Sequence, residues 1–71
     1  MSYFSRFGTP SFSGHAFARC IERGITLVEV DAALRTEPVD GSQEGTLWYR
    51  GPDVLIVVDA ASGTFITMWR P

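Results

Sequence analysis

Hydrophobic and polar residues follow two different periods along the chain, and the period changes near residue 46. Between residues 14 and 36, apolar side chains recur every three or four positions, which is typical of amphipathic helices. From residue 46 onward the period is two, and β-branched and aromatic residues dominate, which predicts strands. This order of elements predicts an α+β domain.

Start and stop signals delimit two helices. Ser13 is a suitable N-cap and Gly24 fits the left-handed position that ends a helix, so we expect a first helix over residues 14–23. Thr26 begins a capping box, T-x-x-E, which predicts a second helix that ends near residues 35–36, before Pro38. At 100° per residue, one side of the first helix is apolar and is expected to face the core: Phe17, Cys20 and Ile21.

Three strands follow, over residues 46–50, 54–59 and 64–69, separated by turns of hairpin length. The middle strand is apolar on both faces, as expected at the centre of a sheet. We therefore predict two N-terminal helices packed on a three-stranded or four-stranded antiparallel sheet, in the order α-α-β-β-β. Residues 13–71 form this single domain. Residues 1–12, with four aromatic side chains among Ser, Gly and Pro, form either an irregular arm or an edge strand.

The last strand carries alternating side chains that could line a binding face. We expect Ile66 and Met68 to face the helices, which places three side chains on the other face: Phe65, Thr67 and Trp69. Depending on the register, they share that face with Leu47 and Tyr49 or with Trp48 and Arg50. Aromatic rings beside arginines suit stacking on unpaired bases, but the same rings could also complete a small core.

Composition limits the possible partners. The 71 residues carry a net charge of −2, and all six basic residues are arginine, so any contact with RNA must be local. One cysteine and one histidine allow no intrachain disulfide and no zinc ligand set, and we expect neither a metal nor a cofactor. The chain has no signal-peptide pattern and no apolar run of 18 residues, which predicts a cytoplasmic protein without membrane contact.

The only histidine lies on one stripe of the first helix with two arginines. His15, Arg19 and Arg23 fall within an arc of about 80°, with Glu22 beside them. His15 could act as general acid or base on a phosphodiester while Arg19, Arg23 or Arg70 stabilises the charge of the transition state. The second proton transfer would then use Glu22, Tyr49 or water. Alternatively, the stripe is a solvated face with an Arg19–Glu22 pair.

Three segments resemble a small bacterial family of unknown function: HAFARCIERGIT at 15–26, WYRGPDVLIVVD at 48–59 and FITMWR at 65–70. The family pattern is HAxxRxxxRGI, a glycine-containing hairpin and a final strand. That family is similar to the RelE and BrnT toxins of the barnase, EndoU, colicin and RelE nuclease group. The resemblance implies a metal-independent endoribonuclease of toxin type that pairs with a cognate antitoxin. Its implied catalytic residues are His15, Arg19, Arg23, Thr67 and Arg70, and we expect substrate contacts from Glu22, Tyr49, Arg50 and Trp69.

Two predictions compete with this function. The first is a non-catalytic protein-interaction module, antitoxin-like, phage-encoded or regulatory, in which the arginines pair with acidic groups of a protein partner. The second is a homodimer formed through an exposed edge strand, which could coexist with either function.

Overall fold

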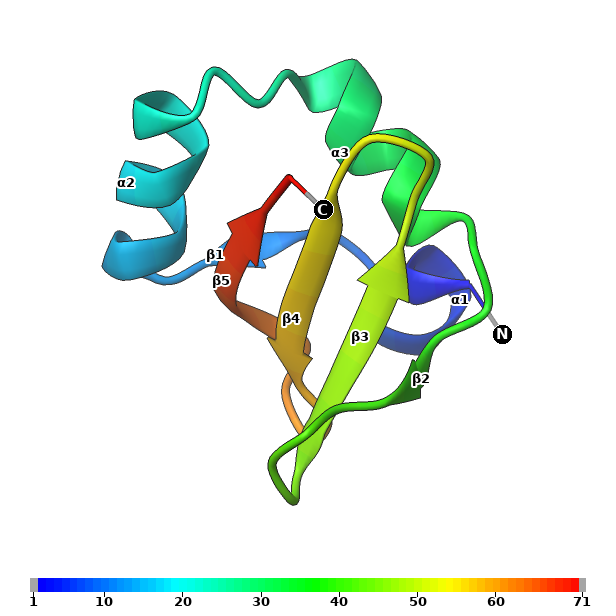
Figure 1. Ribbon diagram of the computed structural model, residues 1–71. Coiled ribbons are helices and arrows are strands. Elements are labelled where there is room, and N and C mark those ends of the chain that lie inside the picture. The colour runs from blue at the N-terminus through cyan, green and yellow to red at the C-terminus, as the bar shows by residue number, and fades with distance from the viewer. Residues whose placement is uncertain (1, 71) are drawn as a thin grey trace.

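The computed structural model describes residues 2–70, and over this range it forms two layers, a sheet of five strands and three helices that cover one face of it (Figure 1). The elements follow the order α1 (Tyr3–Phe7), β1 (Ser11–Phe12), α2 (Gly14–Glu22), α3 (Leu27–Leu34), β2 (Val39–Asp40), β3 (Thr46–Arg50), β4 (Leu55–Asp59) and β5 (Thr64–Trp69). The strand order in the sheet is β1-β5-β4-β3-β2. Strand β1 runs parallel to β5, and all other neighbours are antiparallel.

The α+β class, helices α2 and α3 and the three long strands agree with the pattern in the sequence. The expected three-stranded or four-stranded antiparallel sheet is wrong, because two additional strands, β1 and β2, extend the sheet at its edges and β1 makes it mixed. Each of these strands has two residues. A segment of two residues has no measurable period, so its pairing depends on the neighbouring strand.

The helix caps form as the sequence predicts. Ser13 Oγ accepts a hydrogen bond from the amide of Ala16 at the start of α2. Thr26 and Glu29 form both hydrogen bonds of the capping box at the start of α3. Between the helices, Gly24 has a φ of 62°, in the left-handed region that glycine adopts at low cost. These signals fix the junction between α2 and α3.

The aromatic side chains of residues 2–12 pack in or against the core, and the segment includes a helix that the pattern did not predict. Tyr3, on α1, is fully buried and makes edge-on ring contacts with Tyr49 and Phe65. Its hydroxyl donates a hydrogen bond to the carbonyl oxygen of Gly63. An irregular arm is therefore the wrong description of this segment, and the alternative of an edge strand holds only for Ser11–Phe12.

Helix α2 is rotated about its axis relative to the expected orientation. Ala16 is fully buried and Cys20 half-buried, but Phe17 is 56% exposed and Ile21 66% exposed. The expectation that Phe17 and Ile21 face the core is wrong, because α2 lies alongside β5 and turns its arginine side toward that strand. Arg23 Nη1 donates to the carbonyl oxygen of Met68 at 2.9 Å, which anchors this orientation.

A bulge in β5 determines which of its side chains face the helices. Val57 pairs with Thr67 whereas Val58 pairs with Phe65, so Ile66 is the extra residue. Phe65 and Met68 are fully buried, and Ile66 is 39% exposed. The assignment of Met68 to the helix side is confirmed. The assignments of Phe65 and Ile66 are wrong, because the bulge reverses the alternation between them.

Candidate functional site

The face of the sheet opposite the helices, called here the outer face, contains a shallow hollow of about 200 Å³. It is lined by side chains of the three long strands and by the loop before β3: Ser42, Gln43, Thr46, Trp48, Val57, Ile66, Thr67 and Trp69. Of the two registers left open by the sequence, the structure therefore has the one that places Trp48 beside Thr67 and Trp69.

Two tryptophans dominate the outer face. The rings of Trp48 and Trp69 meet edge to face, with centroids 6.2 Å apart and planes at 81°. They come from β3 and β5, which flank β4, and they shield two side chains of that strand, Leu55 and Val57, which are 4% and 8% exposed. The tryptophans thus complete the packing of the sheet and still present half-buried rings to the surroundings.

Arginines border the tryptophan pair on two sides. Arg23, at the end of α2, lines a second hollow together with Trp69 and Arg70. Arg50 lies two positions after Trp48 on β3, so both side chains are on the same face. Arg50 is opposite Leu55 of β4, and Leu55 is opposite Trp69 of β5. Within residues 2–70, Arg50 is exposed and forms no hydrogen bond or ion pair. The outer face therefore combines stacked rings with at least one uncommitted cation.

The His15, Arg19 and Glu22 part of the predicted stripe is an exposed network within α2. Arg19 Nε lies 3.4 Å from His15 Nε2, and Arg19 Nη1 lies 3.1 Å from Glu22 Oε2. These three residues lie together, as the helical spacing implies. Ser13, which begins the helix, donates to the carbonyl oxygen of Ile66 at 3.4 Å, so the first turn of α2 lies next to the bulge of β5.

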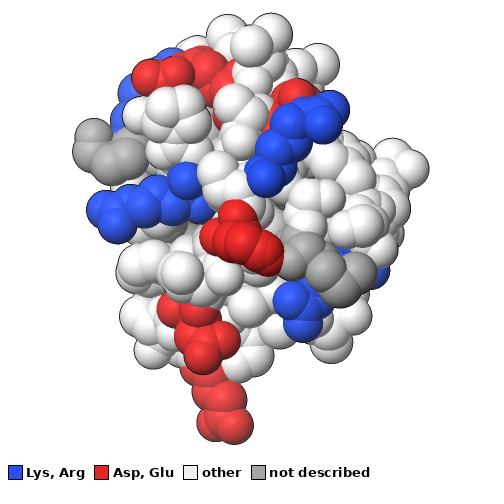
Figure 2. Space-filling view, turned by 90° about the vertical axis from the view of Figure 1, so that its right-hand side faces the viewer, with Lys and Arg blue, Asp and Glu red and all other residues white. Residues whose placement is uncertain are grey.

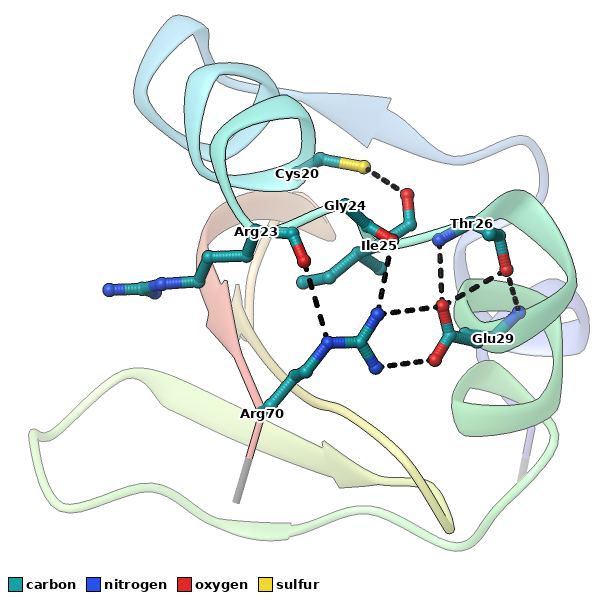
Figure 3. Close-up of polar contacts among 7 residues, drawn as sticks. All are labelled: Cys20, Arg23, Gly24, Ile25, Thr26, Glu29 and Arg70. Atoms are coloured by element: carbon teal, nitrogen blue, oxygen red, sulfur yellow. Dashed lines mark hydrogen bonds and ion pairs between the residues drawn. The ribbon is translucent and has the colours of Figure 1, made fainter.

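Arg70 lies beside Arg23 but belongs to a cluster of polar contacts with Glu29 at the junction of α2 and α3, called here the buttress (Figure 3). Its guanidinium binds both carboxylate oxygens of Glu29, at 2.5 and 3.1 Å. It also donates to the carbonyl oxygens of Arg23, at 3.4 Å, and Gly24, at 3.0 Å, whereas the side chain of Arg23 points away (Figure 3). Arg70 therefore closes the end of α2 onto the end of β5 and satisfies carbonyl groups that the helix leaves free.

The contact between Arg70 and Glu29 makes the free energy of unfolding depend on pH. Hydrogen bonds from Arg70 lower the pKa of Glu29 to about 2, against an ordinary value of 4.5. A carboxyl with a lowered native pKa stabilises the fold fully above pH 4.5 and loses this contribution as the pH falls toward 2. We expect Glu29→Gln, which keeps the capping box, to lower the melting temperature at pH 7, to lower it by less at pH 3 and to converge with the wild type only near pH 2.

Asp31→Asn is the matched control for this prediction. Asp31 pairs with Arg35 at 2.8 Å on the surface of the same helix, and both side chains are about half exposed or more. An exposed pair contributes little to stability. Thermal unfolding of the three proteins at pH 7 and pH 3 tests the prediction, and a Glu29→Gln deficit of equal size at both values contradicts it.

Tyr49 lies on the opposite side of β3 from Trp48. It is fully buried among core residues, and its hydroxyl has no hydrogen-bond partner within residues 2–70. Burial raises the pKa of Tyr49. This position faces the helices, so a substrate on the outer face would not meet the Tyr49 hydroxyl.

The structure thus divides the nine predicted site residues among four places. Arg23, Arg50, Thr67 and Trp69 lie at or beside the outer face, His15, Arg19 and Glu22 along α2, Arg70 in the buttress and Tyr49 in the core. Sequence reasoning left out Ser42, Gln43, Thr46 and Val57 and placed Ile66 on the opposite face. The loop residues carry no periodic signal, and Val57 is indistinguishable from a core residue.

Comparison of the chain with protein-family models, curated proteins and solved structures finds no match. The resemblance to RelE-type and BrnT-type toxins therefore stays a prediction. Within residues 2–70, no three His, Cys, Asp or Glu side chains are grouped so that they could hold a metal ion. Over the same residues, no helix has the length and apolar character that a membrane crossing needs.

Proposed function

We propose that the protein binds single-stranded RNA on the outer face of its sheet. The observation that supports this proposal is the pair of half-buried tryptophans, Trp48 and Trp69, on an open face flanked by Arg23 and Arg50. Unpaired bases stack on aromatic rings, and guanidinium groups contact the phosphates between them. An open sheet face lets splayed bases lie against its rings, and it offers no element that enters a groove of a duplex.

The distribution of charge favours recognition by stacking over recognition by a long-range field. The net charge is −2, and on the side of the molecule shown in Figure 2 basic and acidic side chains are interspersed without a large patch of one sign. A protein of this kind gains little from nonspecific attraction to the phosphate backbone. Most of its affinity must come from the contacts that the tryptophans make.

Substitution of either tryptophan is expected to weaken RNA binding strongly. Stacking of one base on an aromatic ring contributes about 1–3 kcal/mol, so Trp48→Ala and Trp69→Ala should each raise the dissociation constant by about 5-fold to 150-fold. Fluorescence anisotropy with a labelled single-stranded RNA of mixed sequence measures this effect. The same RNA in duplex form should bind more weakly than the single strand.

Val28→Ala and Arg35→Gln are the controls for these variants. Val28 is a 79% exposed apolar side chain on α3, and Arg35 is an exposed arginine at the end of the same helix, so both lie on the helix side of the molecule. Neither substitution should change the dissociation constant more than about twofold. Equal losses in the tryptophan variants and these controls, or no binding by the wild type, would refute RNA binding on the outer face.

Cleavage of the bound strand is a separate proposal, supported by the resemblance to toxin ribonucleases and by the exposed position of His15 in the first turn of α2, which begins next to the bulge of β5. In such a reaction His15 removes the proton of a 2′-hydroxyl, which attacks the adjacent phosphorus and expels the 5′-oxygen, leaving a 2′,3′-cyclic phosphate. The leaving oxygen takes its proton from water. Gel analysis of the RNA after incubation distinguishes binding alone from cleavage, and His15→Ala should abolish only the cleavage.

A further inference from the structure

The helix side of the molecule exposes several large apolar side chains that do not pack in the core. Phe17 and Ile21 of α2 are 56% and 66% exposed, and Leu27 and Val28 of α3 are 74% and 79% exposed. Together these four residues expose roughly 500 Å² on typical side-chain areas, which is within the range of functional patches on small proteins. None of them lies on the outer face.

These side chains border a groove between α1, β1 and α3, called here the helix-side groove. The groove has a volume of about 250 Å³ and is lined almost entirely by apolar side chains: Phe4, Pro10, Phe12, Leu27, Val30, Asp31 and Leu34. Phe12 contacts Phe17 edge to face at 6.2 Å, which connects the groove to the exposed side of α2. Phe17 and Leu27 therefore form one continuous apolar surface with the groove, and Ile21 and Val28 lie next to them on the same two helices.

A second copy of the chain fits this surface better than a charged partner does. A two-fold interface uses the same patch on both subunits, so the patch must contain both a projection and a hollow. Leu27 projects beside the hollow formed by Phe4, Phe12 and Leu34. The charged residue of the lining, Asp31, is already neutralised by Arg35 at 2.8 Å, so two copies of the groove do not repel each other.

The areas are also consistent with a dimer. A stable interface buries about 800 Å² on each partner, and the four exposed side chains alone supply roughly 500 Å² of it. A chain of 71 residues buries only about 60% of its surface by folding alone, so association would add a substantial apolar contribution.

We propose that the protein forms a two-fold homodimer in which the helix-side groove of each copy packs against Leu27 and its apolar neighbours in the other. This arrangement differs from dimerisation through an edge strand. The outer faces, on the opposite side of each sheet, stay free and point away from the interface.

Analytical ultracentrifugation of the full chain tests the dimer. We expect the wild type to sediment as a dimer at micromolar concentrations and Leu27→Glu to raise the dimer dissociation constant at least 100-fold. Ile21→Lys, at a second exposed site on α2, should have the same direction of effect. Both positions are exposed in one copy, so circular dichroism should show that the variants keep their fold.

Val39→Glu is the control that distinguishes the two modes of association. Val39 is 56% exposed and belongs to β2, the edge strand farthest from α2 in the sheet. The proposal predicts that this variant stays dimeric. A monomeric wild type at several hundred micromolar, or a dimer that Val39→Glu disrupts and Leu27→Glu does not, would overturn it.

Discussion

Replacement of Gly63 by alanine is expected to lower the free energy of unfolding by about 3 kcal/mol. Gly63 lies in the β4–β5 turn with a φ of 76°, a conformation that an L side chain adopts at a cost of about 1 kcal/mol. The added methyl group would also overlap the ring of Phe7, coming within 2.7 Å of its Cδ1 atom. Phe7 is itself packed against Tyr3, with ring centroids 5.0 Å apart, so the overlap displaces α1.

Gly45→Ala is the matched control because it separates backbone strain from the overlap. Gly45 has a similar φ of 81°, but an added Cβ there meets no atom within 4 Å. This variant should therefore lose only about 1 kcal/mol. Urea denaturation followed by circular dichroism gives both values. Equal losses at the two glycines would mean that α1 does not pack on this turn.

The same contact explains why the N-terminal segment could not be predicted from its own residues. Helix α1 has five residues, too few to be stable alone or to show a helical period. It forms because Tyr3 enters the core and its hydroxyl reaches Gly63, 60 positions along the chain. The aromatic residues of the segment indicated that it packs on the domain. They did not indicate that it forms a helix.

Local signals, by contrast, were sufficient for α2, α3 and the three long strands. Ser13 and the Thr26–Glu29 capping box satisfy amide groups within three residues, so their effect can be inferred without the rest of the fold. The period of two in the last 26 residues likewise reflects alternation within each strand. The orientation of α2 could not be predicted in this way, because it depends on the hydrogen bond between Arg23 and Met68 of β5, 45 positions along the chain.

The candidate site was predicted in its residue types but only partly in its arrangement. Thr67 and Trp69 could be assigned to a common face because they are two positions apart on one strand. The partnership of Trp69 with Trp48 depends on the register of β3, β4 and β5. The contacts of Arg70 depend on Glu29, 41 positions away. The sequence predicted that Arg70 contacts a substrate, whereas in the structure it connects the ends of two helices.

The bulge in β5 leads to the prediction with the largest expected effect on stability. Phe65→Ala should lower the free energy of unfolding by about 3–5 kcal/mol, because it removes a fully buried ring that contacts Tyr3 and Phe12 and leaves a cavity. Ile66→Ala should lower it by less than about 1 kcal/mol, because that side chain is 39% exposed on the outer face. Strict alternation along the strand, with Ile66 inside, would reverse this order.

Urea denaturation of the two variants measures the difference directly. At roughly 0.05–0.15 kcal/mol per residue, a domain of 71 residues has a stability of roughly 4–11 kcal/mol, so at the lower end of this range Phe65→Ala is largely unfolded even without urea. Phe65→Leu, which keeps most of the buried volume, then provides a measurable value and should still lose more than Ile66→Ala. If Ile66→Ala is destabilised more than Phe65→Leu, then Ile66 and not Phe65 packs under the helices. Phe65 would in that case line the hollow on the outer face in place of Ile66.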